Sequence, residues 1–281
     1  MNAAWRVAGS SIPLDRPLIA GILNVTPDSF SDGGRLDAEA AADHAVRLVE
    51  EGADLIDIGA QSTRPGCPDP VPLEVEWQRL EPVLDRVASR IPDVPVSVDT
   101  VKSEIARRAL QSGAVAINDV SALRSDAAIA DRCAESGAGL IMMHSRGDLS
   151  TMATYELAQY DNVIEEVVRE LDSALAEATR RGVERSQIVL DPGLGFSKTP
   201  EQTFEAFRHL PALLALGYPI MIGPSRKRFL GAVTGRDVEH RDVATAAACG
   251  AAYLLGAHIF RVHAVAQTLD ALRVVAAVQG A

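Results

Sequence analysis

The stretch that decides the fold is Gly21-Ile22-Leu23-Asn24-Val25-Thr26-Pro27-Asp28-Ser29-Phe30-Ser31-Asp32-Gly33-Gly34. Its first half is a short apolar run, which is typical of a parallel strand buried on both faces. Its second half is polar and contains glycine and proline, so we expect the chain to leave the sheet at or just after Asn24. A buried strand that ends on an amide and opens into a loop predicts a functional site at that end of the sheet.

The same design is repeated along the chain. Further strands are predicted near residues 55–58, 96–98, 115–117, 139–143, 188–190, 219–222 and 258–262. Amphipathic helices separate them, and glycines that end helices precede most strands: Gly52, Gly113, Gly137, Gly182, Gly217 and Gly256. Eight strands that alternate with eight helices predict an α/β fold, a single (β/α)8 TIM barrel over residues 1–281, rather than an open doubly wound sheet. No glycine-rich nucleotide-binding loop follows the first strand.

Composition and charge exclude several classes of protein. A net charge of -11 argues against a nucleic-acid partner, because phosphate binding needs a basic face. Cys67, Cys133 and Cys249 are widely spaced, which predicts neither a disulfide framework nor a zinc site and fits a cytoplasmic location. Residues 1–16 lack the apolar core of a signal peptide. Residues 243–260 are long and nearly uncharged, but their alanines and two glycines favour a helix followed by a strand over a membrane span.

Polar side chains stand at nearly every predicted strand end. Active sites of such barrels lie at the carboxyl ends of the strands. The residues there are Asn24, Asp57, Asp99, Asn118, Asp119, His144, Asp191, Ser225, Lys227, Arg261 and His263. Any one Asp or Asn in such a place can be a helix cap or a turn former. A polar or ionisable residue at almost every end is not explained by capping and predicts one shared site.

The chemistry of these residues divides into two groups. Two carboxylates, an amide and an ammonium suit a flat heterocycle that carries N–H groups, because an ionised acid accepts paired hydrogen bonds: Asp99, Asn118, Asp191 and Lys227. Arg261 and His263 alternate along the last strand and so point to the same side. With Asn24 they predict a site for an anion or a metal-bound phosphate. The alternative for the Arg261 and His263 pair is a salt bridge with an acid of the barrel.

Residues 191–198 form a glycine-rich loop between a predicted strand and helix. Glycines let the backbone approach a ligand closely, and Phe196 can stack on an aromatic ring. As a lone signal this loop is equally well an ordinary turn. Residues 62–66 likewise form a loop with a cation and a rigid proline.

Taken together and in order, these segments resemble the bacterial dihydropteroate synthases, which are pterin-binding enzymes. The segments are 21–34, 62–66, 97–100, 118–119, 143–144, 191–198, 225–227 and 261–263. The resemblance implies a (β/α)8 barrel with mobile loops after its first two strands. It also implies a Mg2+-dependent transferase of folate biosynthesis. Such an enzyme joins 6-hydroxymethyl-7,8-dihydropterin diphosphate to p-aminobenzoate, with 7,8-dihydropteroate and pyrophosphate as products.

The resemblance further implies a role for each matching residue. The pterin ring would be held by Asp99, Asn118, Met143, Asp191, Phe196 and Lys227. The p-aminobenzoate would be held by Phe30, Thr63, Arg64, Pro65, Phe196 and Ser225. The diphosphate would meet Asn24, Arg261 and His263, with Asn24 also a Mg2+ ligand. The catalytic group would be Lys227, Asp99, Asp191, Arg261 and His263, in a dissociative mechanism in which pyrophosphate leaves before the arylamine attacks. Members are commonly homodimers and are inhibited by sulfonamides, which imitate p-aminobenzoate.

Three departures from the family pattern keep other functions open. Ala60-Gln61 stands where Gly-Glu is usual, Ser145 where Met is common, and Ala264 where Asp is usual. One rival is the pterin domain of a methyltetrahydrofolate-dependent methyltransferase, which has no need of the two aminobenzoate loops. The other is a non-catalytic paralogue that binds pterin without turnover.

Overall fold

The computed structural model describes residues 4–26, 31–32, 35–61 and 71–280. Eight parallel strands form the central sheet, in the order β10-β9-β8-β7-β6-β3-β12-β11. Their bounds are β3 Leu18–Asn24, β6 Leu55–Gly59, β7 Val96–Asp99, β8 Ala116–Asp119, β9 Gly139–Met143, β10 Ile188–Asp191, β11 Met221–Ile222 and β12 Ile259–Val262. A bridge between Leu190 and Ile220 joins β10 to β11, so the sheet curls into a nearly closed barrel. The predicted (β/α)8 barrel is confirmed.

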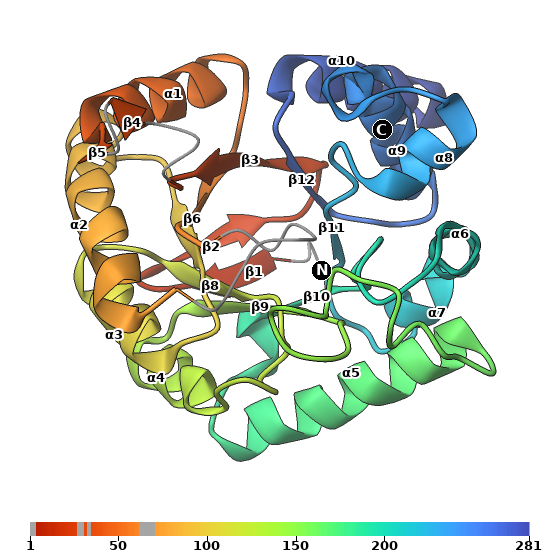
Figure 1. Cartoon of the computed structure of the whole chain (residues 1–281), viewed down its shortest axis with the longest axis horizontal. Coiled ribbons are helices and arrows are strands. Elements are labelled where there is room, and N and C mark those ends of the chain that lie inside the picture. The colour runs from red at the N-terminus through yellow and green to blue at the C-terminus, as the bar shows by residue number, and fades with distance from the viewer. Residues whose placement is uncertain (1–3, 27–30, 33–34, 62–70, 281) are drawn as a thin grey trace.

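Helices surround this barrel and connect its strands (Figure 1). Their bounds are α1 Ala38–Glu50, α2 Leu73–Arg90, α3 Ser103–Gln111, α4 Ala128–Ser136, α5 Val163–Arg180, α6 Pro200–Arg208, α7 Leu210–Leu214, α8 Arg228–Thr234, α9 Asp242–Leu254 and α10 Val265–Gln279, with short 3-10 turns at Arg185–Gln187 and Val238–His240. Side chains cap the start of several of these helices. The Asp37 side chain accepts the Ala40 N–H at 3.0 Å at the start of α1. Thr199 and Gln202 form the capping box of α6.

Three features differ from the sequence expectation. The single helix expected between Thr199 and Gly217 is broken into α6 and α7, because Pro211 has no N–H to continue the first helix. The unpredicted α8 follows directly after Lys227. An antiparallel hairpin, β1 Ala4–Val7 with β2 Ser10–Pro13, precedes the barrel, and a second short pair is formed by β4 Ser31–Asp32 and β5 Arg35–Leu36.

The strands pack apolar side chains on both of their faces. Outward residues such as Ile19, Ile56 and Ile117 pack in the large core shared with the helices. Inward residues fill the barrel interior together with Trp5 of β1: Leu18, Ala20, Leu55, Ala116, Ile141, Val189, Met221 and Ile259. Trp5 is fully buried, and its indole N–H donates to the Gln187 carbonyl at 2.7 Å, so the hairpin closes the amino-terminal end of the barrel.

The polar site follows from this apolar layer by the two-residue period of a strand. Each of the following residues lies two positions after an inward apolar one and therefore faces the interior at the next level: Asp57, Asn118, Met143, Asp191 and Arg261. The barrel thus has an apolar base, and above it a polar layer at the carboxyl ends of its strands.

Candidate active site

Asp57 accepts the central hydrogen bonds of the polar layer. Its carboxylate is fully buried within β6. It accepts from the Ser97 hydroxyl at 2.5 Å, from the Asn118 amide at 3.1 Å and from Arg261 Nε at 2.5 Å. The sequence placed Asp57 at a strand end without a role. The sequence pattern that indicates a role is the spacing of Leu55 and Asp57. Residues two apart on a strand face the same side, so Asp57 lies directly above an apolar residue of the barrel interior.

Arg261 connects Asp57 to Asp99. Its Nη2 donates to Asp99 Oδ2 at 2.9 Å, so one guanidinium holds two acids. Burial works against the charge of Arg261, but Asp57 and Asp99 outweigh it and raise the Arg261 pKa. Burial raises the pKa of Asp99, and Arg261 only partly offsets this. The structure therefore shows the salt bridge with barrel acids that the sequence left open, and the diphosphate role of Arg261 stays a prediction.

Lys227 and Asp191 form the neighbouring part of the site. The Lys227 ammonium lies 4.1 Å from the centre of the Phe196 ring and donates to the Leu194 carbonyl. Burial lowers the pKa of Lys227 to about 7, although the Asp191 carboxylate acts in the opposite direction. Burial raises the pKa of Asp191, against the effect of Lys227 and of the Gly193 N–H, which donates to Asp191 at 2.7 Å.

The glycine-rich loop lies close against the end of β9. Gly193 has φ +65°, and a β-carbon there would stand 1.8 Å from the His144 carbonyl oxygen, so only glycine fits. The loop then places Phe196 in a small apolar cluster with Met143 and Met152. The ring and thioether groups predicted to hold a pterin therefore pack together, beside Lys227.

Asn24, Ser225 and His263 form a second polar group. The Asn24 amide Nδ2 lies 3.2 Å from His263 Nε2, and Ser225 Oγ lies 2.9 Å from His263 Nδ1. Both contacts are satisfied when Nδ1 carries the hydrogen, because the amide then donates to Nε2 and Nδ1 donates to the hydroxyl. The sequence assigned Ser225 to the p-aminobenzoate pocket, whereas here it holds the histidine that was assigned to the diphosphate.

A metal ion held by the protein alone is not indicated in the described ranges, where no three His, Cys, Asp or Glu side chains are grouped to bind one. The Asn24 amide oxygen, for its part, has no hydrogen-bond partner among the described residues. An amide oxygen suits Mg2+, which commonly keeps one or two protein ligands and takes the rest from phosphates and water. The donor set therefore fits Mg2+ that arrives with a diphosphate.

Four predicted p-aminobenzoate residues lie outside the described residues: Phe30, Thr63, Arg64 and Pro65. Gln61 accepts from Lys102 Nζ at 3.2 Å, and Ser145 donates to the Val120 carbonyl at 2.8 Å. Ala264 is buried before α10, which has no side-chain cap. None of the three removes a contact of the polar layer.

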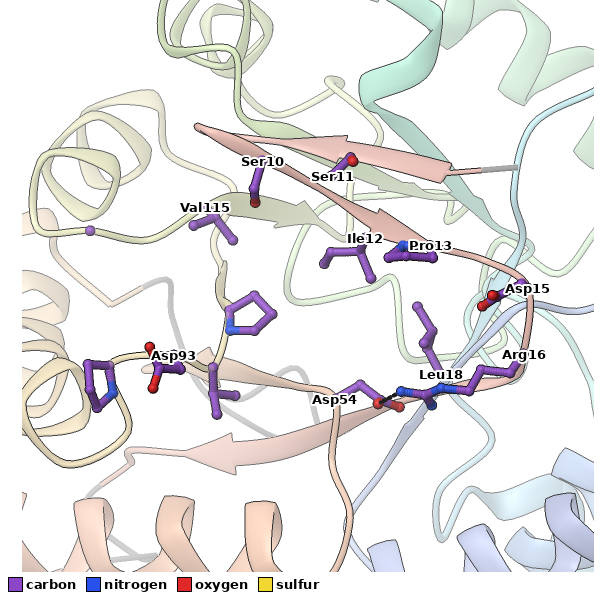
Figure 2. A pocket seen from close by; sticks show the side chains of 14 residues that line it. Ser10, Ser11, Ile12, Pro13, Asp15, Arg16, Leu18, Asp54, Asp93 and Val115 are labelled. Carbon is purple, nitrogen blue, oxygen red and sulfur yellow. Dashed lines mark hydrogen bonds and ion pairs between the residues drawn. The ribbon is translucent and has the colours of Figure 1, made fainter. Parts of the chain in front are cut away.

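A separate pocket lies at the opposite end of the barrel (Figure 2). It is lined by the β1–β2 hairpin and by residues that precede strands, among them Asp54, Asp93 and Val115. Its arginine, Arg16, is already paired with Asp54 at 2.5 Å. Residues at this end of such a barrel serve stability rather than catalysis.

Comparison with known proteins identifies the family to which this barrel and its polar site belong. A family model described as pterin binding enzyme matches residues 20–263, so the fold and the site define a pterin-binding barrel enzyme. The mitochondrial folate synthesis bifunctional protein of Pisum sativum is 46% identical over 272 residues, 92% of this chain. The chain covers only 52% of that relative, about half of its length. The dihydropteroate synthase of Mycobacterium leprae is 43% identical over 266 residues, 92% of each chain.

Solved structures give the same result. Dihydropteroate synthase of Xanthomonas albilineans with 4-aminobenzoic acid superposes with a TM-score of 0.92 at 43% identity, over 100% of both chains. The same enzyme in complex with 7,8-dihydropteroate gives 0.87 at 42% identity, over 98% and 99%. The Yersinia pestis enzyme with a sulfonamide drug gives 0.91 at 34%, over 99% and 100%. The chain therefore belongs to the pterin-binding enzyme family, among the dihydropteroate synthases, and is a transferase. No helix in the described part of the chain is both long and apolar enough to cross a membrane.

Proposed function

We propose that this chain condenses 6-hydroxymethyl-7,8-dihydropterin diphosphate with p-aminobenzoate, releasing pyrophosphate first and forming 7,8-dihydropteroate. The observation that carries the proposal is the linked set of buried and half-buried charges, in which Arg261 joins the buried Asp57 to the half-buried Asp99, and the half-buried Lys227 stands beside the buried Asp191. Two acids, Asp99 and Asp191, suit a ring that becomes cationic when its substituent leaves. Two cations beside them suit the departing phosphates.

Each acid has a distinct part in this scheme. Asp99 and Asp191 accept hydrogen bonds from the edge of the pterin, and the Asn118 amide can donate as well as accept there. Phe196 and Met143 cover the apolar surface of the ring. When the ring takes the Asp99 carboxylate, the fully buried Asp57 still holds Arg261 through Nε. The other N–H groups of Arg261 are then available to the leaving diphosphate. Lys227 donates as an ammonium, and the neutral aniline needs no strong base in order to attack.

The diphosphate end is assigned to Asn24, His263 and Arg261. Bound Mg2+ would stabilise the negative charge of the leaving pyrophosphate, and the Asn24 oxygen is the ligand that this chain offers. The Asn24–His263–Ser225 hydrogen bonds hold both side chains in place beforehand. In this role Ser225 positions His263 and lies next to the p-aminobenzoate that the family binds.

The partners follow from the same assignment. We expect p-aminobenzoate and sulfonamides to share one pocket, as the ligands of the Xanthomonas and Yersinia enzymes suggest. The buried, unbridged Cys133 and Cys249 support a reducing, cytoplasmic location. The exposed apolar face between α9 and α10 supports a homodimer.

A pyrophosphate-release assay with each substrate alone and with both tests the function. Release that needs both substrates and Mg2+, with 7,8-dihydropteroate as product, supports the synthase. Tight pterin binding without product would support the non-catalytic paralogue, and methyl transfer from methyltetrahydrofolate would support the methyltransferase. We expect Lys227→Ala to lower kcat about 10²- to 10⁴-fold with little loss of thermal stability. Wild-type turnover in that variant would show that Lys227 is misassigned.

A further inference from the structure

Another lysine, which is fully buried, lies behind the glycine-rich loop. Lys198 is fully buried at the end of that loop, just before α6. Its ammonium lies 2.9 Å from His144 Nδ1, 3.3 Å from the Gly193 carbonyl and 3.2 Å from the Phe196 carbonyl. Three acceptors match the three N–H groups of an ammonium, yet none of them is a carboxylate. A lysine buried in this way is rare without a specific partner.

The two lysines hold the same loop from its two sides. Lys198 takes the carbonyls of Gly193 and Phe196, and Lys227 takes the carbonyl of Leu194 between them. The loop packs closely on Lys227, since a β-carbon at Gly195 would lie 3.1 Å from Lys227 Cδ. A displacement of this backbone therefore moves the Phe196 ring and the acceptor of Lys227 together.

Lys198 is itself fixed by His144 and Glu170. His144 Nε2 lies 3.0 Å from Glu170 Oε2, and Arg146 forms an ion pair with the same carboxylate. Burial lowers the pKa of His144 to about 3, so the imidazole is neutral, donates to Glu170 and accepts from Lys198. The chain of contacts is thus directed, from the Lys198 ammonium through the ring to a carboxylate.

We propose that Lys198, oriented by His144 and Glu170, is a positioning residue that sets the place of Phe196 and of the Lys227 ammonium in the pterin site. The inference rests on the proposed role of Lys227. Lys198 acts without touching the substrate. It fixes the loop, and its charge repels that of Lys227 as long as Lys198 is protonated, because burial and then Lys227 lower the pKa of Lys198 to about 7. The other charged groups that act on Lys198 are Asp191, Arg146 and Glu170.

The test compares Lys198→Met with Gln187→Leu. Gln187 is the matched control, because it is also buried and also donates to two backbone carbonyls, those of Cys133 and Ala138, but lies before β10 at the other end of the barrel. We expect Lys198→Met to lower kcat about ten- to a hundredfold through misplacement of the site. The alkaline limb of kcat/KM should also move to higher pH, because Lys227 keeps its proton longer without a neighbouring positive charge. Gln187→Leu should change neither value at a comparable melting temperature.

A second variant covers the case in which Lys198→Met does not fold. His144→Phe keeps the lysine and the ring shape but removes one acceptor, and we expect a smaller fall in kcat with the limb shifted in the same direction. Variants that match Gln187→Leu in kcat, KM and pH profile would overturn the inference. A wild-type protein that forms no 7,8-dihydropteroate would instead overturn the proposed function, so the two failures are distinguishable.

Discussion

At the scale of single residues, the charge of Lys227 responds to pH near neutrality. Burial lowers its pKa to about 7, so the free protein loses the Lys227 proton as the pH rises above that value. Only the ammonium can donate a hydrogen bond and carry positive charge. We therefore expect kcat/KM for the pterin diphosphate to fall about tenfold per pH unit on the alkaline side. Asp99 gives the opposite pH dependence, because activity that needs the ionised Asp99 carboxylate rises as this group loses its proton.

Lys227→Arg is the control for this assignment. A guanidinium stays charged to well above pH 10, so the alkaline limb should disappear even if kcat is lower. The measurement is a pH series of initial rates at low pterin diphosphate concentration. A limb that stays near pH 7 in the variant would assign it to a different group.

Asp57 matters for a different reason, because it is the buried acceptor for three donors. Asp57→Asn keeps the shape but removes the charge that faces Arg261. We expect a loss of about 2–3 kcal/mol in the free energy of unfolding, measured with urea, and a fall in kcat/KM. Asp43→Asn is the comparison, since Asp43 forms an exposed pair with Arg90 at 2.6 Å that contributes less than about 1 kcal/mol. Equal losses of unfolding free energy in the two variants would show that the buried hydrogen bonds of Asp57 contribute no more than an exposed salt bridge.

At the scale of elements, the β1–β2 hairpin closes the base of the barrel through Trp5. Trp5→Ala should cost about 3–5 kcal/mol of unfolding free energy, because a fully buried indole and its hydrogen bond are lost together. Its neighbour Arg6 is 45% exposed and pairs with Glu184, so Arg6→Ala should change stability by less than about 1 kcal/mol. The KM values of Trp5→Ala should stay unchanged, because Trp5 lies at the far end from the site. A shifted KM without loss of stability would contradict this role.

The elements also show what the sequence could predict. Local signals were sufficient for most strands and helices, because a terminal glycine or a cap such as Asp37 acts within a few residues. The hairpin was readable as well, since apolar Trp5 and Val7 flank the charged Arg6, which is the two-residue period of a strand. In the structure Trp5 and Val7 are buried and Arg6 is exposed. The break at Pro211 needed only the rule for proline.

Local sequence patterns could not predict which residues of the site pair with one another. Asp57 and Arg261 are 204 positions apart, and they meet because β12, β3 and β6 are neighbours in the closed sheet with a fixed register. The sequence could place both near strand ends, but which acid takes which cation depends on strand tilt and on the apolar layer beneath. Lys198 likewise belongs to a loop that the sequence predicts, and only the fold shows that its ammonium lies against His144.

At the scale of the whole molecule, α9 and α10 present the apolar surface that a second copy would cover. The two helices pack on each other, and a shallow groove between them is lined by Ala247, Ala251, Leu254 and Val274. Leu254 is 56% exposed and Val274 is 64% exposed. Small residues on α9 allow close approach, and a two-fold axis would place the same patch of both copies together. Each polar site is built within one chain, so the dimer would not be needed to complete it.

Val274→Asp tests this surface, because a two-fold contact would bring two new carboxylates together beside Asp270 of each copy and remove them from water. We expect the wild type to sediment as a dimer and Val274→Asp as a monomer that still forms product. Val233→Asp is the matched control, since Val233 is 65% exposed but lies on α8, and this variant should remain dimeric. A wild type that sediments as a monomer would show that the chain does not dimerise. A Val274→Asp protein that stays dimeric would place the interface away from α9 and α10. Because the charge of the added aspartate is screened only weakly once buried, dissociation should persist at high salt, whereas an effect of surface repulsion alone would disappear.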